Sequence, residues 1–382
     1  MRIALVAPLV STIADPYIGG AQALLADLAR GLHKRGHHVT LFARAGSSLD
    51  GIEIESIAVP ENVRPATFAA PTNSASADAG FFAQANIFLE LFLQLQQRSD
   101  EFDLIHAHAF DWPAYTCSAL VNTIPVLHTI HLPAIKSEIN EALRVLDQQG
   151  HPLTLITVSQ HCAYTYAAST PIDYVIHNGL DVDAIPFQPT VARNAPLLCA
   201  GRIAPEKGVE AAIEIAERAN HPLIIAGGIY DQEYYEQYIA PRIAHAGSRI
   251  TYVGQVEREA LWRLMGQAAA LLCPIAWDEP FGLVPVEAMA TGTPVIAFRR
   301  GAMEEIINHA ETGFLVEPGE CAQAAELIDD LPDIPRARCR AHVEENFALD
   351  TMLSEYERVY REVTMLALPL ADQAHLQSLE HQ

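Results

Sequence analysis

Short apolar runs alternate with amphipathic segments along almost the whole of this 382-residue chain. An apolar run of about four to eight residues predicts a buried strand, and apolar residues spaced three and four apart predict a helix that covers a core. Strands and helices in regular alternation are typical of a parallel sheet with helices on both faces. The sequence therefore predicts an α/β fold.

The first alternation occupies roughly the first half of the chain. Its expected strands are Arg2–Ala7, His38–Phe42, Leu104–His106, Pro125–Thr129, Leu155–Val158 and Tyr174–His177. The first helix is expected over Gly20–Lys34, because its leucines fall on one face and Gly36 follows it. Residues 61–80 are rich in Pro, Ala, Ser and Asn and should form a loop, before a core helix over Phe81–Arg98.

A second alternation begins near Pro196 and predicts a second doubly wound sheet. Its strands are expected at Leu197–Ala200, Leu223–Ala226, Ile250–Val253, Ala270–Cys273 and Pro294–Ala297. Its helices are expected at Val209–Arg218, Gln232–Ala244, Arg258–Met265 and Val284–Ala290. The proline-punctuated segment Ile185–Pro189 suits a linker between the two sheets.

This pattern predicts two Rossmann-like domains, at residues 1–185 and 186–350. Residues 351–382 are expected to form a C-terminal helix and a tail that is loosely held after Leu366. Ligands of open α/β sheets bind beyond the carboxyl ends of the strands, so the cleft between the two domains is the expected site.

Charge and cysteine content exclude several classes of protein. The net charge is −23, with −7 on residues 1–180 and −16 on the rest. Such a field repels nucleic acid and anionic lipid, so neither a nucleic-acid partner nor membrane association is expected. The six cysteines form no CxxC pair, which indicates reduced thiols in a cytoplasmic protein, and no segment is apolar enough over about eighteen residues to span a membrane.

The sequence WDEPFGLVPVEAMA combines a loop, a helix start and two carboxylates. A helix N-terminus is positive and presents unpaired N–H groups, so the amides near Gly282, Leu283 and Val284 can bind a phosphate. Glu279 and Glu287 lie on either side of these amides. A carboxylate beside a phosphate makes electrostatic sense if it binds hydroxyl groups, and sugars and ribose present vicinal hydroxyls.

A second segment, GRIAPEKG, directly follows the strand expected at Leu197–Ala200. It places two cations, Arg202 and Lys207, at the carboxyl end of that strand. An arginine fork and a lysine point charge are complementary phosphate ligands. Two cations in a loop are by themselves more often a solvated surface. Beside a helix start flanked by two glutamates, however, they indicate a diphosphate site.

Together these segments resemble the family-four retaining glycosyltransferases of the GT-B fold. Seven residues separate Glu279 from Glu287, as in the double-glutamate motif of that family, and GRIAPEKG is similar to its donor-diphosphate motif. Other similar segments are the Gly19-Gly20 loop, DLIHAH from Asp103, VIHNGLD from Val175 and EEII…TGFLV from Glu304. The resemblance spans about residues 1–365 and implies two Rossmann-like domains with a cleft between them.

The resemblance also implies roles for the motif residues. Arg202 and Lys207 would hold the diphosphate of the donor, Glu287 its ribose, and Glu279 the transferred hexose. The implied donor-binding set is Gly19, Gly20, Arg202, Lys207, Val256, Glu279, Phe281, Gly282, Leu283, Val284 and Glu287. Within that set, the first helix would direct its N-terminus at the phosphate, and the nucleobase would lie near Val256.

The family also has an active-site histidine, for which VLHTIH offers two candidates. His131 falls just past the end of a strand and is the preferred candidate. His128 falls within the strand and is expected to be packed. The implied catalytic residues are therefore His131, Glu279, Arg202 and Lys207.

No metal site or cofactor is predicted. The pairs His128/His131 and His106/His108 have no acidic or cysteine partner nearby in the sequence, as a metal site would need. Asp181-Val182-Asp183 resembles the DxD motif of metal-dependent glycosyltransferases, but it enters the expected linker and is interpreted as a hinge.

These features predict a metal-independent hexosyltransferase that uses a nucleotide diphosphate sugar and retains the anomeric configuration of its donor. UDP-glucose is favoured over GDP-mannose, and the acceptor is expected to be a small soluble molecule. A UDP-sugar 2-epimerase, a GDP-mannose-dependent mannosyltransferase and a non-catalytic nucleotide-sugar-binding protein remain as alternatives. No GxGxxG follows the first strand, which argues against a dehydrogenase.

Overall fold

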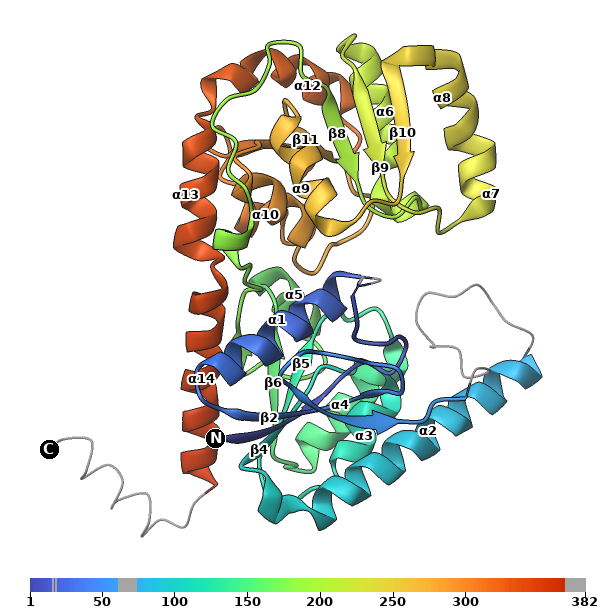
Figure 1. Ribbon diagram of the computed structural model, residues 1–382. Coiled ribbons are helices and arrows are strands. Elements are labelled where there is room, and N and C mark those ends of the chain that lie inside the picture. Colours follow the sequence, from blue (N-terminus) through green and yellow to red (C-terminus); the bar gives the residue numbers. More distant parts are fainter. Residues whose placement is uncertain (16, 18, 61–73, 368–382) are drawn as a thin grey trace, which may run out of the picture. The chain divides into compact units, whose positions relative to one another are not determined.

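The computed structural model describes residues 1–15, 17, 19–60 and 74–367 (Figure 1). The chain falls into two compact units, one made of Met1–His177 with the C-terminal helix that begins at Leu349, and the other of Asn178–Ala348. Each unit contains one parallel sheet, as the alternation of apolar runs predicts. The units divide at His177, whereas the sequence alone suggests a division at residue 185.

The sheet of the first unit has seven strands in the order β3-β2-β1-β4-β5-β6-β7, and all neighbours are parallel. The strands are β1 (Arg2–Val6), β2 (His38–Arg44), β3 (Glu53–Ile57), β4 (Leu104–Ala107), β5 (Val126–Ile130), β6 (Leu153–Thr157) and β7 (Tyr174–Val175). β3 was not predicted, because this edge strand (EIESI) is short and has no apolar run.

Helices cover both faces of this sheet. They are α1 (Gly20–Lys34), α2 (Ser74–Gln97), α3 (Trp112–Ser118), α4 (Ser137–Gln148), α5 (Gln160–Tyr166) and α14 (Leu349–Leu366). α1 has the predicted bounds and packs so closely on α14 that a Cβ on Gly31 would lie 2.5 Å from Leu353 Cδ1. Arg35 also forms ion pairs with Asp350 and Glu357 of α14. These contacts join the C-terminal helix to the first unit.

The helix α2 is longer than the sequence suggests. It begins at Ser74, so residues 74–80 are helical and not part of a loop, because their alanines favour a helix. Residues 61–73, and the expected tail after residue 367, lie outside the described residues. Phe88 and Phe92 are fully buried in the core, whereas the side chain of Phe82 is 65% exposed. Phe82 is therefore the most exposed aromatic residue of α2, followed by Phe81 at 38%.

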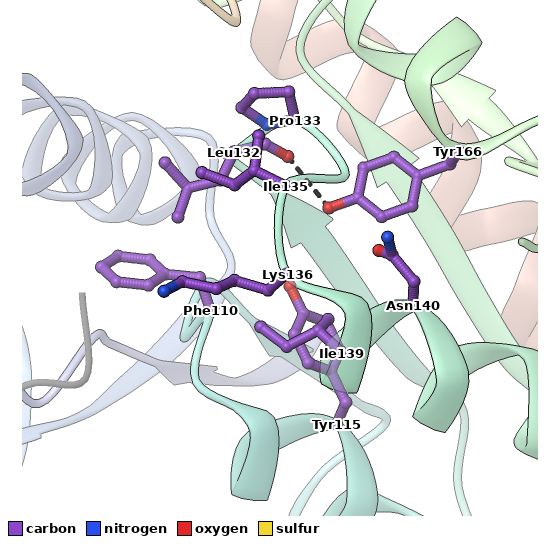
Figure 2. A pocket seen from close by; sticks show the side chains of 9 residues that line it. All are labelled: Phe110, Tyr115, Leu132, Pro133, Ile135, Lys136, Ile139, Asn140 and Tyr166. Atoms are coloured by element: carbon purple, nitrogen blue, oxygen red, sulfur yellow. Dashed lines mark hydrogen bonds between the residues drawn. The ribbon is translucent and has the colours of Figure 1, made fainter. Parts of the chain in front are cut away.

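A small, mostly apolar pocket opens at the end of β5 in the first unit (Figure 2). It is lined by Phe110, Tyr115, Leu132, Pro133, Ile135, Lys136, Ile139, Asn140 and Tyr166. The Tyr166 hydroxyl donates a hydrogen bond of 3.0 Å to the Leu132 carbonyl. The amide of Asn140 donates to the Ala134 carbonyl, while its buried Oδ1 has no partner among the described residues. The pocket thus combines aromatic walls with an unused hydrogen-bond acceptor.

The sheet of the second unit has six parallel strands in the order β10-β9-β8-β11-β12-β13. They are β8 (Leu197–Ala200), β9 (Leu223–Ala226), β10 (Ile250–Gly254), β11 (Leu271–Cys273), β12 (Val295–Phe298) and β13 (Gly313–Val316). The first five match predicted strands to within one residue at each end. β13 was not among the predicted strands.

The helices of the second unit include one irregular segment. They are α6 (Val209–Arg218), α7 (Gln232–Tyr234), α8 (Ala240–Ala246), α9 (Arg258–Gln267), α10 (Leu283–Ala290), α11 (Met303–Ile306), α12 (Cys321–Glu326) and α13 (Arg336–Asn346). The single helix expected over Gln232–Ala244 is interrupted by a π-helical turn at Tyr235–Ile239. Pro241 explains the interruption, because it has no N–H to donate to the carbonyl one turn earlier.

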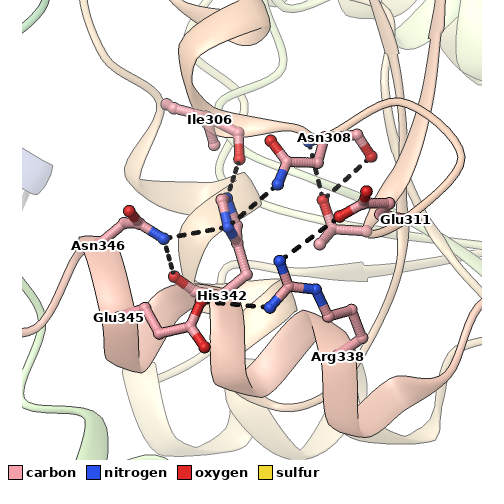
Figure 3. Close-up of polar contacts among 8 residues, drawn as sticks. Ile306, Asn308, Glu311, Arg338, His342, Glu345 and Asn346 are labelled. Carbon is pink, nitrogen blue, oxygen red and sulfur yellow. Dashed lines mark hydrogen bonds and ion pairs between the residues drawn. The ribbon is translucent and has the colours of Figure 1, made fainter.

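Side chains of the helix α13 form hydrogen bonds to backbone carbonyls of other segments in the second unit. Arg340 donates to the carbonyls of Val182 and Ile185, so the segment expected as a linker is anchored to this unit. Figure 3 shows a second polar cluster on the same helix, in which His342 Nε2 lies 2.9 Å from the Ile306 carbonyl oxygen. Asn346 contacts the His342 ring at 3.2 Å. α13 therefore holds the segment around Val182–Ile185 and the end of α11.

Two further observations concern the state of the cysteines and the length of the helices. All six cysteines are free thiols, and burial raises the pKa of Cys199 and Cys273 to about 12, so these two are protonated at neutral pH. Within the described residues, no helix is both long and apolar enough to cross a membrane.

Candidate active site

The carboxyl ends of β8 and β9 turn through glycines that pack against each other. Gly201 and Gly227 have φ angles of 142° and 153°, and a Cβ on Gly227 would lie 1.7 Å from the Gly201 carbonyl oxygen. The backbone continues the pairing, since Ile203 N–H donates to the Gly228 carbonyl at 2.8 Å. Arg202 lies between these contacts, so its backbone position is fixed at the edge of the sheet.

The next turn brings Lys207 against the end of β11. Residues Pro205–Lys207 form a short 3₁₀ helix that ends at Gly208, with φ 68°. A Cβ on Gly208 would lie only 1.9 Å from the Pro274 carbonyl oxygen. The Ala276 N–H also donates to the Glu206 carbonyl at 2.9 Å. The two sequence motifs, far apart along the chain, therefore meet at this edge of the sheet.

Where the motifs meet, Lys207 and Glu279 form an ion pair. Lys207 Nζ lies 2.6 Å from Glu279 Oε2, and both side chains are mostly buried. The same oxygen accepts a hydrogen bond of 2.7 Å from the indole N–H of Trp277. The ammonium also lies 5.4 Å from the centre of the Trp277 ring, within the range of a cation–π contact. The cation and the carboxylate are thus held together before any ligand arrives.

Gly301 packs directly on the backbone of the loop that carries Glu279. A Cβ on Gly301 would lie 2.3 Å from both the backbone N and O of Glu279, so only glycine fits there. Ala302 N–H donates to the Glu279 carbonyl at 2.9 Å. The sequence analysis did not identify Gly301, which lies outside both motifs.

The helix α10 begins at Leu283, directly after Gly282 in a left-handed conformation with φ 108°. A Cβ on Gly282 would lie 2.5 Å from Met303 Cε. Phe281 is buried against Phe347, whereas Leu283 and Val284 are partly exposed. The first N–H groups of a helix have no partner within it, so this end can accept an anionic ligand.

Glu287 is buried one turn further along α10, with 8% of its surface exposed. Its Oε1 accepts from Arg258 Nε at 3.1 Å and from the indole N–H of Trp262 at 3.3 Å. The Arg258 guanidinium also lies 4.9 Å from the Trp262 ring centre. Each glutamate of the motif is therefore held by one cation and one tryptophan N–H. The sequence analysis missed Arg258 and Trp262, although their spacing of four residues on α9 places them on one face of that helix.

Arg202 is the most exposed of the predicted cations. Its guanidinium carbon lies 4.5 Å from the centre of the Tyr230 ring, and its Nη2 lies 3.5 Å from Glu206 Oε1. Tyr230 follows β9, and Val256 follows β10, so both lie beyond carboxyl ends of strands. The edge of the second sheet thus carries all of the donor-binding residues predicted in this unit.

The first unit holds the remaining predicted residues. Gly19 precedes α1 in an extended conformation and Gly20 is the first residue of the helix. A Cβ on Gly19 would lie 2.9 Å from Gln22 Oε1, so glycine leaves the N-terminal backbone of α1 more open than a larger residue would.

His131 lies just past the end of β5, as predicted, and is hydrogen-bonded to another histidine. Its Nε2 lies 2.9 Å from His108 Nδ1, and the two rings are stacked with centres 5.2 Å apart. Burial lowers the pKa of His131 to about 4 and holds that of His108 well below its usual value, so both are neutral at neutral pH. His128 packs elsewhere, with Nε2 3.0 Å from Ser118 Oγ, as expected.

A buried polar network continues from this pair to the C-terminal helix. His106 Nδ1 lies 2.7 Å from the Tyr360 hydroxyl, and His106 Nε2 lies 2.8 Å from Thr129 Oγ1. Thr129 Oγ1 in turn lies 3.1 Å from the Tyr356 hydroxyl. The rings of His106 and His108 are 4.2 Å apart between centres. The helix α14 therefore supports the strand ends that carry His108 and His131.

The structure also bears on metal binding. Over the described ranges, no three or more His, Cys, Asp or Glu side chains are grouped as a metal site would require. Asp181 and Asp183 belong to a turn at Val182–Ala184 in the second unit.

Comparison with known proteins gives consistent results along the whole chain. The family "Glycosyltransferase Family 4" matches residues 18–184, and the family "Glycosyl transferases group 1" matches residues 183–346. A glycogen synthase of Mycobacterium tuberculosis is 28% identical, with 90% of this chain and 91% of that protein covered. A D-inositol 3-phosphate glycosyltransferase of Corynebacterium efficiens is 26% identical, with 95% and 96% covered.

Solved structures share the same architecture. Anabaena HepE, in complex with UDP and glucose, superimposes with a TM-score of 0.72 at 20% identity, covering 94% of this chain and 99% of HepE. Sucrose-phosphate synthase of Thermosynechococcus elongatus gives a TM-score of 0.72 at 22% identity, with 94% and 98% covered.

Proposed function

Because this chain belongs to the family-four glycosyltransferases and has the GT-B fold, we propose that it transfers a hexose from a UDP-sugar, with UDP-glucose favoured, to a small soluble acceptor. The observation that carries the proposal is the Lys207–Glu279 pair beside the start of α10. This arrangement places a cation, a hydroxyl-binding carboxylate and free helix amides at one edge of the sheet.

In the proposed donor site, each part of the nucleotide sugar binds along this edge of the second sheet. The diphosphate binds Arg202, Lys207 and the amides at the start of α10, where charges of the right sign are concentrated. Glu287 accepts hydrogen bonds from the ribose, and Glu279 from the hexose. The base lies near Val256. The complexes of HepE support this nucleotide, since HepE was solved with UDP and glucose and with UDP-glucose.

The proposed mechanism is electrostatic. Charge develops on the diphosphate as the bond to the sugar breaks, and preorganised cations and N–H groups stabilise that charge. The Lys207 ammonium is already fixed by Glu279 and Trp277, so little reorganisation is needed when the donor binds. Arg202, Lys207 and the helix start supply the positive charge that a metal ion would otherwise bring.

A thermal-shift screen of nucleotide sugars tests the donor assignment. UDP-glucose and UDP at a hundred times their dissociation constants should raise the free energy of unfolding by about 2.7 kcal/mol. GDP-mannose at the same concentration should raise it much less. The same shift is expected in EDTA, because the site needs no divalent ion. A larger shift with GDP-mannose, or a shift that EDTA abolishes, would contradict the assignment. Glu257→Gln, next to Arg258, should leave the UDP shift intact, whereas Glu287→Gln should reduce it.

The anomeric configuration of the product is a second test. We expect an α-linked product from an α-linked donor, because the double-glutamate pattern resembles that of retaining enzymes and Glu279 is engaged with Lys207 instead of being poised as a nucleophile. NMR of the new anomeric proton measures this directly. A β-linked product would refute the retaining mechanism.

The acceptor proposal rests on the first unit. The pocket of Figure 2 is lined by Leu132, the residue after His131, and its walls are mostly aromatic and aliphatic. Lys136 lines the exposed side of the pocket and supplies a cation for a polar group of the acceptor. These features support a small polar acceptor with one apolar portion.

Liposome flotation at low salt distinguishes this acceptor from a membrane lipid. We expect little co-flotation with or without anionic lipid, because residues 1–180 carry a net charge of −7. If α2 does bind membranes, Phe82→Asp should abolish the binding, because Phe82 is its most exposed aromatic residue. Tyr164→Asp, at a 79% exposed position on α5, is the matched control. Strong flotation that only Phe82→Asp removes would overturn the proposal.

A further inference from the structure

The hydrogen bond between His108 and His131 determines which nitrogen of each ring carries the proton. The bond joins His108 Nδ1 to His131 Nε2 at 2.9 Å. Both rings are neutral at neutral pH, because burial lowers their pKa values, so each carries one N–H. Only one of the two joined nitrogens can be the donor, and the choice fixes the tautomer of both rings.

The second nitrogen of His108 decides between the two arrangements. His108 Nε2 is buried, and no residue in the described part of the chain pairs with it. If His131 donated to His108, then His108 would carry its proton on Nε2, and a buried N–H would remain without an acceptor. Buried N–H groups without a partner are rarer in proteins than under-satisfied acceptors. The arrangement in which His108 donates leaves only a lone pair unmatched.

We propose that His108 is a positioning residue that sets the tautomer of His131, by donating its Nδ1–H to His131 Nε2. His131 then carries its own proton on Nδ1 and offers an N–H donor to a ligand. In that state His131 is suited to hydrogen-bond a sugar oxygen and not to abstract a proton through Nδ1. This inference rests on the proposed function only in placing His131 beside the ligand.

The surroundings of the pair keep the arrangement in place. The His106 ring packs on His108 with centres 4.2 Å apart, and Tyr356 lies 6.5 Å from the His108 ring centre. His106 is itself held by Tyr360 and Thr129. The position of His108 is therefore determined by the strand ends and by α14, independently of any ligand.

Ring-nitrogen NMR of the whole protein, labelled with ¹⁵N-histidine and free of ligand, tests the proposal. The ¹⁵N shifts distinguish a neutral ring protonated on Nδ1 from one protonated on Nε2, and the signal lost in His131→Gln identifies His131. We expect the Nδ1-protonated form for His131 at neutral pH. A predominantly Nε2-protonated His131 overturns the proposal.

Three variants complete the test. His108→Phe keeps an aromatic ring at this position but removes the N–H donor. His131 should then no longer favour the Nδ1-protonated form. The release of UDP from UDP-glucose should also fall about three- to tenfold in kcat, the effect of one neutral hydrogen bond, with a smaller change in KM. His108→Asn, whose amide can donate from a similar position, should restore both. His128→Phe is the control for the loss of a buried histidine and should leave the His131 signal unchanged.

The outcomes separate this inference from the proposed function. An unchanged His131 tautomer in His108→Phe, or a changed tautomer with unchanged kcat, contradicts the role of His108. Wild-type activity in a folded His131→Gln protein contradicts the placement of His131 at the ligand, and leaves the tautomer assignment standing.

Discussion

Replacing Lys207 with alanine should lower kcat by about two to three orders of magnitude, because the variant loses a cation that stabilises charge developing on the leaving diphosphate. The loss corresponds to about 3–4 kcal/mol in the transition state. Donor binding should weaken less, since the charge on the diphosphate grows only as the bond breaks. Steady-state kinetics of UDP release, combined with a thermal-shift titration of UDP, separate the two effects.

The structure adds a second reason for this effect. In the variant, Glu279 loses the ammonium that lies 2.6 Å from its carboxylate, and a carboxylate without that cation repels the diphosphate. Lys34→Ala, in the last turn of α1, is a suitable control because that lysine is exposed and remote from the motifs in the sequence. Kinetics unchanged from wild type in a folded Lys207→Ala protein would exclude the diphosphate assignment.

Gly208→Ala should destabilise the second unit by about 3–5 kcal/mol. The alanine would have to adopt the left-handed conformation at φ 68°, which costs about 1–2 kcal/mol for a residue with a Cβ. Its Cβ would also lie 1.9 Å from the Pro274 carbonyl oxygen, and backbone of this kind cannot move aside cheaply. Thermal or denaturant unfolding of the purified protein measures the loss.

Gly319→Ala provides the matched control in the same unit. Gly319 has a φ of 91°, but a Cβ there would meet nothing within 4 Å. It should therefore show only the conformational cost, about 1–2 kcal/mol. Equal effects of the two substitutions would mean that the packing of Gly208 on Pro274 contributes nothing. UDP binding should weaken in Gly208→Ala alone, because Lys207 is the residue before it.

The spacing of apolar residues was enough to determine the fold class and most of the regular elements. The bounds of α1, α6, β8 and β9 follow from the sequence without change. The two helices each have one buried face, and the two strands are continuous apolar runs inside the sheet. Two of the failures have a local cause. The strand β3 has no apolar run, and Pro241 interrupts a helix whose overall pattern is regular.

The sequence also named the residues of the candidate site, but not how they are held. Motif spacing identified Glu279, Glu287 and Lys207 as the residues of interest. It gave no sign that Arg258 and Trp262 hold Glu287, or that Lys207 is paired with Glu279. Those contacts join different loops and helices, and periodicity within a segment carries no information about which segments meet.

The same limit applies to the first unit. The sequence placed His131 at the end of a strand and predicted a core helix over the segment that contains Phe88. Only the tertiary structure decided that Phe82 of this helix faces solvent, that His108 is bonded to His131, and that α14 packs on α1. The physical reason is that these contacts depend on how parallel strand ends and distant helices come together in space, which short-range spacing in the chain does not specify.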